Sequence, residues 1–423
     1  MTNTNQFPEI EYKESELTNG LRVVMCRKDN IPMVTVNTSF QIGSKDEDEG
    51  KTGLAHLFEH LMFTESPNVK QGMFDEILNM NGGDSNAFTS WDYTGYHITL
   101  PSNKLELALW LDSDRLAGFN IGEDSLEIQK SVVQEENLQV HENVPYGSLE
   151  RESSKRLFKG NGYERPIIGL MEDVKKLSIE DVKDFFLRYY VPKNSVLSVV
   201  GDIDYDKTLK LITKYYEDIP SGTRILQKKF EDMKITKEIR DNIEDNIELP
   251  AQFIYYKAPG QGTKDYYILR LLSAILSDGE SSKLYNELLY KKELVSEIDS
   301  YYYGMEKAGI FNINAFAMKK VPLKTIGIEI DKIIDAIKSG NLEERELVKV
   351  KNYFETSFVS KRQSMNYLAD TFSFLKIFFN NLSLINTEVS NFLSVQKQDI
   401  IDCARKYMNV ENRVVLNYIP AKK

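Results

Sequence analysis

Two histidines and a glutamate fall within five residues, in the segment His56-Leu57-Phe58-Glu59-His60. Residues four apart lie on the same face of an α-helix, so His56 and His60 could bracket one metal ion. Glu59 lies beside them without having to bind that metal. Two imidazoles, a carboxylate and an open position for water form the usual catalytic zinc site, where a free glutamate can take the proton of the water. The segment therefore predicts a zinc-dependent hydrolase.

The chain has only four histidines, and half of them fall in this segment, which favours a metal site over a chance pairing. His97 and His141 stand alone and are interpreted as ordinary structural residues. A third protein ligand must come from another helix. The residues alone leave five acids open for this role: Glu123, Glu127, Glu135, Glu136 and Glu142.

The elements that must hold these side chains alternate between strand and helix patterns. A hairpin turn at Asn19-Gly20 and an alternating apolar stretch predict strands before the motif, and the motif itself lies on a helix expected over residues 52–63. Further strands are expected at residues 85–90, 93–100 and 196–200, and further helices at residues 72–80, 105–116, 124–140 and 179–190. This mixture predicts an α+β fold.

Part of the chain is repeated. Residues 181–196 align without gaps on residues 399–414, with five identical positions: Asp181/Asp399, Asp184/Asp402, Tyr189/Tyr407, Asn194/Asn412 and Val196/Val414. The repeat predicts two homologous domains, residues 1–220 and 249–423, joined by a charged linker at residues 221–248. Only the first half carries the histidine motif, so the site is expected to be asymmetric.

Charge and hydropathy exclude several classes of partner. A net charge of −11 argues against nucleic acid as a ligand, and no apolar run is long enough for membrane insertion. Residues 1–16 have neither the apolar core of a secretory signal nor the arginine bias of a transit peptide. The expected location is cytoplasmic, or periplasmic if a signal peptide has been trimmed.

Several motifs in order resemble the inverzincin metallopeptidases of the pitrilysin and mitochondrial processing peptidase family. They are residues 53–63, Gly82-Gly83 with residues 86–89, and residues 131–136, 163–169 and 189–194. The resemblance implies two homologous domains, each a mostly antiparallel sheet packed with helices, that form half of a clamshell. It also implies a zinc metalloendopeptidase.

Carried over to this sequence, the resemblance implies that His56 and His60 bind Zn²⁺ and that Glu59 activates water. It implies Glu135 as the third ligand, through the pattern Val-Val-x-Glu. It further implies that Asn86 and Ala87 lie on an edge strand, against which a peptide substrate is added as a strand.

The chain also departs from the family pattern. Members that act alone carry an arginine and, seven residues later, a tyrosine after the motif Ser-Ser-x-Leu; here the aligned residues are Leu289 and Ser296. The expectation is that a homologous subunit supplies the missing pair in a heterodimer, with a homodimer as the alternative. A non-catalytic structural subunit of a larger complex is the competing interpretation. Processing of one precursor or leader peptide, rather than general peptide degradation, also stays open.

Overall fold

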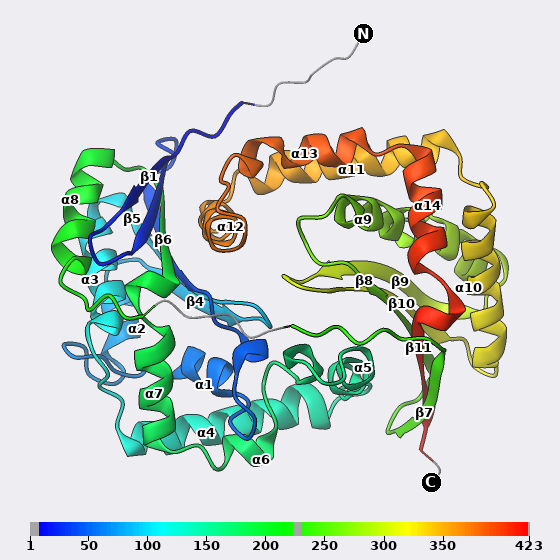
Figure 1. The fold of residues 1–423 in the computed structure, drawn as a ribbon, viewed down its shortest axis with the longest axis horizontal. Coiled ribbons are helices and arrows are strands. Elements are labelled where there is room, and N and C mark those ends of the chain that lie inside the picture. The colour runs from blue at the N-terminus through cyan, green and yellow to red at the C-terminus, as the bar shows by residue number, and fades with distance from the viewer. Residues whose placement is uncertain (1–7, 224–229, 422–423) are drawn as a thin grey trace. The chain divides into compact units, whose positions relative to one another are not determined.

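The computed structural model describes residues 8–223 and 230–421, which pack as two compact units. Unit 1 contains the described residues of Met1–Asn137, Arg165–Lys229 and Val359–Thr387. Unit 2 contains those of Leu138–Glu164, Phe230–Phe358 and Glu388–Lys423. Each unit has its own sheet and its own hydrophobic core, as the mixed strand and helix pattern predicts (Figure 1).

Unit 1 is built on a six-stranded, mostly antiparallel sheet. Its strands, in spatial order, are β1 Lys13–Glu16, β2 Arg22–Arg27, β6 Ser195–Gly201, β3 Met33–Phe40, β5 Thr94–Pro101 and β4 Asp84–Thr89. The predicted Asn19-Gly20 turn joins β1 to β2, and β2 pairs with β6 in parallel. β4 pairs with β5 and ends the sheet, so one of its backbone edges is free of strand partners within the described residues.

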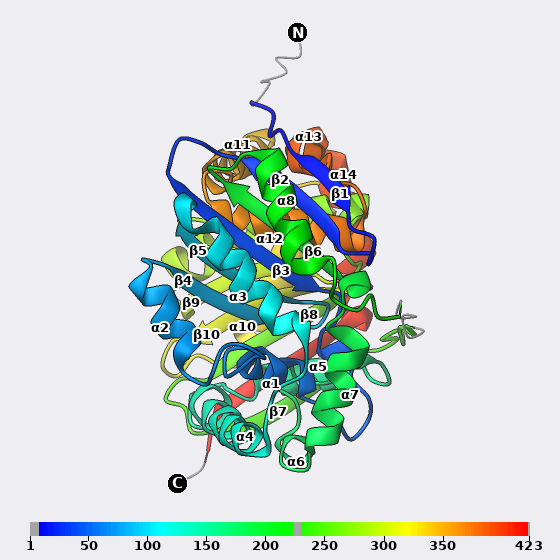
Figure 2. The ribbon, with the colours of Figure 1, turned by 90° about the vertical axis from the view of Figure 1, so that its left-hand side faces the viewer.

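Helices cover both faces of this sheet. Figure 2 shows α3 and α8 across one face, and α12 packs against β6 and β3 on the other, where Leu368 and Phe372 share a hydrophobic cluster with Val24 and Val196. The unit 1 helices are α1 Leu54–Leu61, α2 Met73–Met80, α3 Leu105–Ala117, α4 Glu123–Asn137, α6 Met171–Val174, α7 Ile179–Tyr189, α8 Tyr205–Tyr216 and α12 Met365–Phe378.

Unit 2 has a five-stranded sheet in the order β7 Ile239–Asp245, β11 Arg413–Pro420, β8 Ala251–Ala258, β10 Gly309–Ala317 and β9 Val295–Gly304. Its helices are α5 Leu149–Leu157, α9 Lys264–Ser277, α10 Leu323–Lys338 and α14 Lys397–Tyr407. α11 Glu344–Lys361 and α13 Leu384–Ser394 each contain one of the points where the chain passes from one unit to the other. Part of the predicted linker is therefore a strand, since β7 pairs in parallel with β11.

The two sheets repeat the same order and strand directions. In unit 1, β2 runs parallel to β6, and β3, β5 and β4 follow as antiparallel neighbours. In unit 2, β7, β11, β8, β10 and β9 take the corresponding places with the same directions. This agreement confirms the α+β class.

Local geometry explains why particular residues of the repeat recur. Asp181 and Asp399 each accept the backbone N–H three residues earlier, which completes a capping box at the start of α7 and of α14. Asn194 and Asn412 donate their side-chain N–H groups to the carbonyls of Tyr189 and Tyr407, at 2.9 and 3.1 Å. The repeated residues therefore build a helix, turn and strand in both halves.

Each unit also contains a helix from the other half of the sequence. α5 belongs to the first half by position but packs against β8 and β11 of unit 2, whereas α12 belongs to the second half and packs in unit 1. The packing units and the sequence halves are thus different divisions of the chain. In the part of the chain that the structure describes, every helix is too short or too polar to cross a bilayer.

Candidate metal centre

The helix predicted from the motif is present as α1, from Leu54 to Leu61. Leu57, Phe58 and Leu61 are fully buried in the unit 1 core, where Phe58 packs on aromatic rings of α7. Burying each of these side chains is worth about 1.5–3 kcal/mol, which fixes the rotation of the short helix about its axis. The remaining face, with both histidines and the glutamate, is only partly buried and lies toward β4 and α4.

His56, His60 and Glu136 converge on one point. The Oε2 atom of Glu136 lies 3.6 Å from Nε2 of His56 and 3.3 Å from Nε2 of His60. One ligand atom from each residue lies within 4.8 Å of the others. Three ligands held about 2.1 Å from one tetrahedral ion would be about 3.4 Å apart, so both the donor types and their spacing fit zinc.

The structure corrects the expected third position, because Glu136, and not Glu135, lies beside the histidines. Successive helical residues are about 100° apart, so the two carboxylates leave α4 in different directions, and Glu135 is exposed. The buried residues Leu126, Lys130 and Val133 mark the inner face of α4, which continues three residues on at Glu136. The spacing of these residues was the sequence feature that could have selected Glu136. The pattern Val-Val-x-Glu selects a residue by its neighbours in the sequence and does not define a face of the helix.

Glu59 is held by a hydrogen bond from the sheet. The hydroxyl of Thr89, at the end of β4, donates to Oε2 of Glu59 at 2.6 Å. Burial raises the pKa of Glu59, and the charge of Glu136 acts in the same direction, while the Thr89 hydrogen bond and His60 lower it. Thr89 belongs to a motif that the sequence singled out, but its contact with Glu59 was not foreseen, because it joins residues 30 positions apart.

Asn86 and Ala87 lie on the predicted edge strand, β4. Asn86 is exposed, and its Oδ1 atom accepts the backbone N–H of Ala87 at 2.9 Å. Ala87 packs partly against the unit 1 core. The side-chain oxygen of Asn86 thus occupies the backbone N–H of Ala87.

The residues aligned with the missing arginine and tyrosine belong to unit 2. Leu289 packs partly against the core of that unit, and Ser296 lies exposed on β9, where its hydroxyl donates to the carbonyl of Phe316. Neither side chain can stabilise a developing negative charge as a guanidinium or phenol would. His97, on β5, and His141 do not belong to the metal-ligand cluster.

Comparisons with known proteins identify the family of the chain. The model of the insulinase family (peptidase family M16) matches residues 22–170, and that of the peptidase M16 inactive domain matches residues 176–354. A zinc protease, PqqE, of Helicobacter pylori is 30% identical over 404 residues, which cover 94% of this chain and 90% of that protein.

Solved structures show the same fold. The crystal structure of a protease from Helicobacter pylori matches with a TM-score of 0.92 and 28% identity, covering 97% of this chain and 100% of that chain. A peptidase M16 inactive domain from Pseudomonas fluorescens matches with a TM-score of 0.87 and 19% identity, covering 98% of this chain and 99% of that one. On these matches and motifs, the chain belongs to the pitrilysin or insulinase family, peptidase family M16.

Proposed function

We propose that this protein is a zinc-dependent endopeptidase that cleaves unfolded peptides or a precursor or leader peptide. The observation that carries the proposal is the convergence of His56, His60 and Glu136 beside Glu59, whose carboxylate stays outside the ligand cluster. This arrangement leaves one acid available for proton transfer. All four side chains come from residues 1–220. We propose that these residues form the zinc-binding domain, followed by a linker at residues 221–248 and a homologous second domain at residues 249–423.

In this proposal His56, His60 and Glu136 hold the ion. Bound zinc supplies a Lewis acid that polarises the scissile carbonyl and lowers the pKa of a water molecule. Glu59 accepts a proton from the attacking water as the new carbon–oxygen bond forms. It then gives that proton to the leaving amine nitrogen as the carbon–nitrogen bond breaks. The hydrogen bond from Thr89 orients the carboxylate for both transfers.

The edge strand β4 is the proposed docking place for the substrate. An extended peptide can pair with the open edge of a sheet through backbone hydrogen bonds. Such a strand beside Asn86 and Ala87 would run along the same element that ends at Thr89, which contacts Glu59. The amide of Asn86 would have to move from the N–H of Ala87 to make room for the peptide.

A homologous subunit is the proposed partner. Leu289 and Ser296 offer no side chain for stabilising the oxyanion. The match of residues 176–354 to a domain described as inactive supports a division of roles between the metal-binding part of the chain and the rest of it. The partner would supply an arginine and a tyrosine. A homodimer is the alternative. In that case Tyr290 and Tyr301, which are exposed and lie near Leu289 and Ser296 in the sequence, are the candidates for the missing tyrosine.

The test is a Glu59→Gln variant, which keeps the size of the side chain but cannot accept the proton. We expect it to bind zinc as the wild type does and to lose peptide hydrolysis, whereas His60→Ala should lose both. Hydrolysis of a quenched fluorescent peptide is measured first with this chain alone and then with a homologous subunit. An unchanged rate for the Glu59 variant, in whichever assembly is active, would refute the assignment of the base.

A further inference from the structure

The start of α1 has no side-chain cap of its own. Its N-cap residue is Gly53, in a left-handed conformation with φ of 87°, and its first turn contains no acid. The first four N–H groups of an α-helix have no partner within the helix. In an eight-residue helix this matters for the metal centre, because His56 lies in the first turn and would move if that turn frayed.

Glu47 supplies the missing acceptors from outside the helix. One carboxylate oxygen accepts the N–H of Gly53 and the other accepts that of Ala55, both at 2.8 Å. The side chain is only 3% exposed. Burial raises the pKa of Glu47 to about 8, although the two N–H groups and Arg165 favour its ionised form. An acid at this buried position is costly, so its contacts with the helix must offset a large desolvation penalty.

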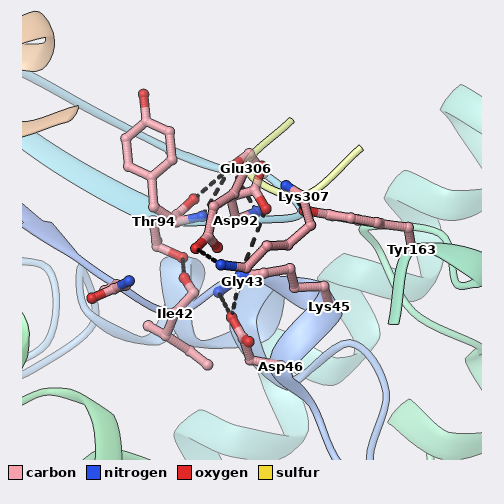
Figure 3. A network of polar contacts seen from close by, with 12 residues as sticks. Ile42, Gly43, Lys45, Asp46, Asp92, Thr94, Tyr163, Glu306 and Lys307 are labelled. Carbon is pink, nitrogen blue, oxygen red and sulfur yellow. Dashed lines mark hydrogen bonds and ion pairs between the residues drawn. The ribbon is translucent and has the colours of Figure 1, made fainter. Parts of the chain in front are cut away.

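The segment that carries Glu47 is itself fixed to the sheet. The N–H of Gly43 donates to Asp46, and the ammonium group of Lys45 lies 2.9 Å from Asp46 and 3.6 Å from Asp92 (Figure 3). Just before this segment, the hydroxyl of Thr94 on β5 donates to the carbonyl of Ile42 at 2.9 Å. These contacts tie residues 42–46, just before Glu47, to the loop between β4 and β5 and to the start of β5.

A second segment, residues 165–170, packs against the start of α1. Arg165 donates to the backbone carbonyl of Glu47 at 3.0 Å, and the N–H of Leu170 donates to the hydroxyl of Thr52 at 2.9 Å. Gly169 crosses Gly53 so closely that a Cβ atom on Gly169 would lie 2.3 Å from Cα of Gly53. This contact gives a physical role to the motif at residues 163–169.

We propose that Glu47 is a positioning residue for the metal centre, which holds the first turn of α1 so that His56 meets His60 and Glu136 at ligand spacing. The role rests on the proposed zinc function. It acts through the backbone N–H groups of Gly53 and Ala55, and Glu47 itself touches neither metal nor substrate. Loss of the two hydrogen bonds should therefore weaken zinc binding in a protein that is still folded.

The experiment compares Glu47→Ala and Glu47→Gln with Asp204→Ala. Asp204 caps α8 by accepting the N–H of Lys207 at 3.0 Å, so its variant also loses a capping carboxylate in unit 1, but far along the chain from α1. The zinc dissociation constant is measured by competition with a chelator, under conditions where circular dichroism shows each variant folded. The visible spectrum of the cobalt(II)-substituted protein reports ligand geometry independently of activity.

We expect Glu47→Ala to lose zinc affinity about tenfold or more, as is typical when a group that orients a ligand is removed, and to change the cobalt spectrum. Glu47→Gln keeps one acceptor and should lie between it and the wild type, and Asp204→Ala should match the wild type. If Glu47→Ala does not fold, Glu47→Gln decides. Wild-type affinity and spectrum in the Glu47 variants would overturn the positioning role. A wild-type protein that binds no zinc would instead overturn the proposed function, and this role with it.

Discussion

Exchanging Glu136 for alanine should remove one of three protein ligands from the proposed metal centre. Its Oε2 atom is within 3.6 Å of both imidazoles, so the remaining histidines would share the ion with water alone. Zinc binding in four-ligand protein sites is worth about 10–16 kcal/mol, or about 2.5–4 kcal/mol per ligand. At about 1.4 kcal/mol per factor of ten, the dissociation constant should rise by about 10²–10³-fold.

Glu135→Ala provides the matched control. This acid is adjacent in sequence and exposed, so its removal changes the charge equally but takes away no ligand. Its effect on zinc affinity should stay within about 0.5 kcal/mol, or roughly twofold. Both constants are measured by chelator competition on folded protein at the same pH. Strong loss of zinc in Glu135→Ala, with Glu136→Ala unaffected, would refute the assignment from geometry and restore the position expected from the sequence motif.

Two further predictions concern unit 1. Thr89→Val removes the hydrogen bond to Glu59. Since a hydrogen bond to a charged group is worth about 1.5–3 kcal/mol, kcat should fall about tenfold or more while zinc content is unchanged. Thr89→Ser should retain activity, and equal rates for the valine and serine variants would contradict the role of Thr89 in orienting Glu59. Burial raises the pKa of Asp370, which accepts a hydrogen bond from Tyr93, to about 6. Its contribution to stability is therefore complete below about pH 4, where the unfolded group is also protonated, and is lost as pH rises through 6. In urea unfolding at pH 8, the free energy of unfolding of Asp370→Asn should exceed that of the wild type by about 1–2 kcal/mol, a figure discounted for partial exposure of the side chain. Near pH 4 the two proteins should be equally stable. A difference that does not change with pH would argue against this titration.

The helix, turn and strand of the repeat could be predicted because two of the five repeated pairs make contacts within a few positions of themselves. Asp181 and Asp399 cap their own helices, and Asn194 and Asn412 bond carbonyls five residues earlier. The exchange of α5 and α12 between the units left no comparable signal. Each helix has apolar residues to bury, and its sequence does not encode which of two similar sheets it covers.

The sequence by itself determined His56, Glu59 and His60 as a chemical unit, because three side chains on eight helical residues keep their relation whatever the helix packs against. It also determined the family and the presence of two related sheets. For Glu135 and Glu136 the sequence offered only the spacing of the buried residues of α4 as a guide. The tertiary structure places Glu136 beside the histidines, since its position depends on the rotation of α4 against α1. The contacts of Thr89 with Glu59 and of Glu47 with the start of α1 likewise join separate segments, whose approach is set by core packing rather than by local sequence.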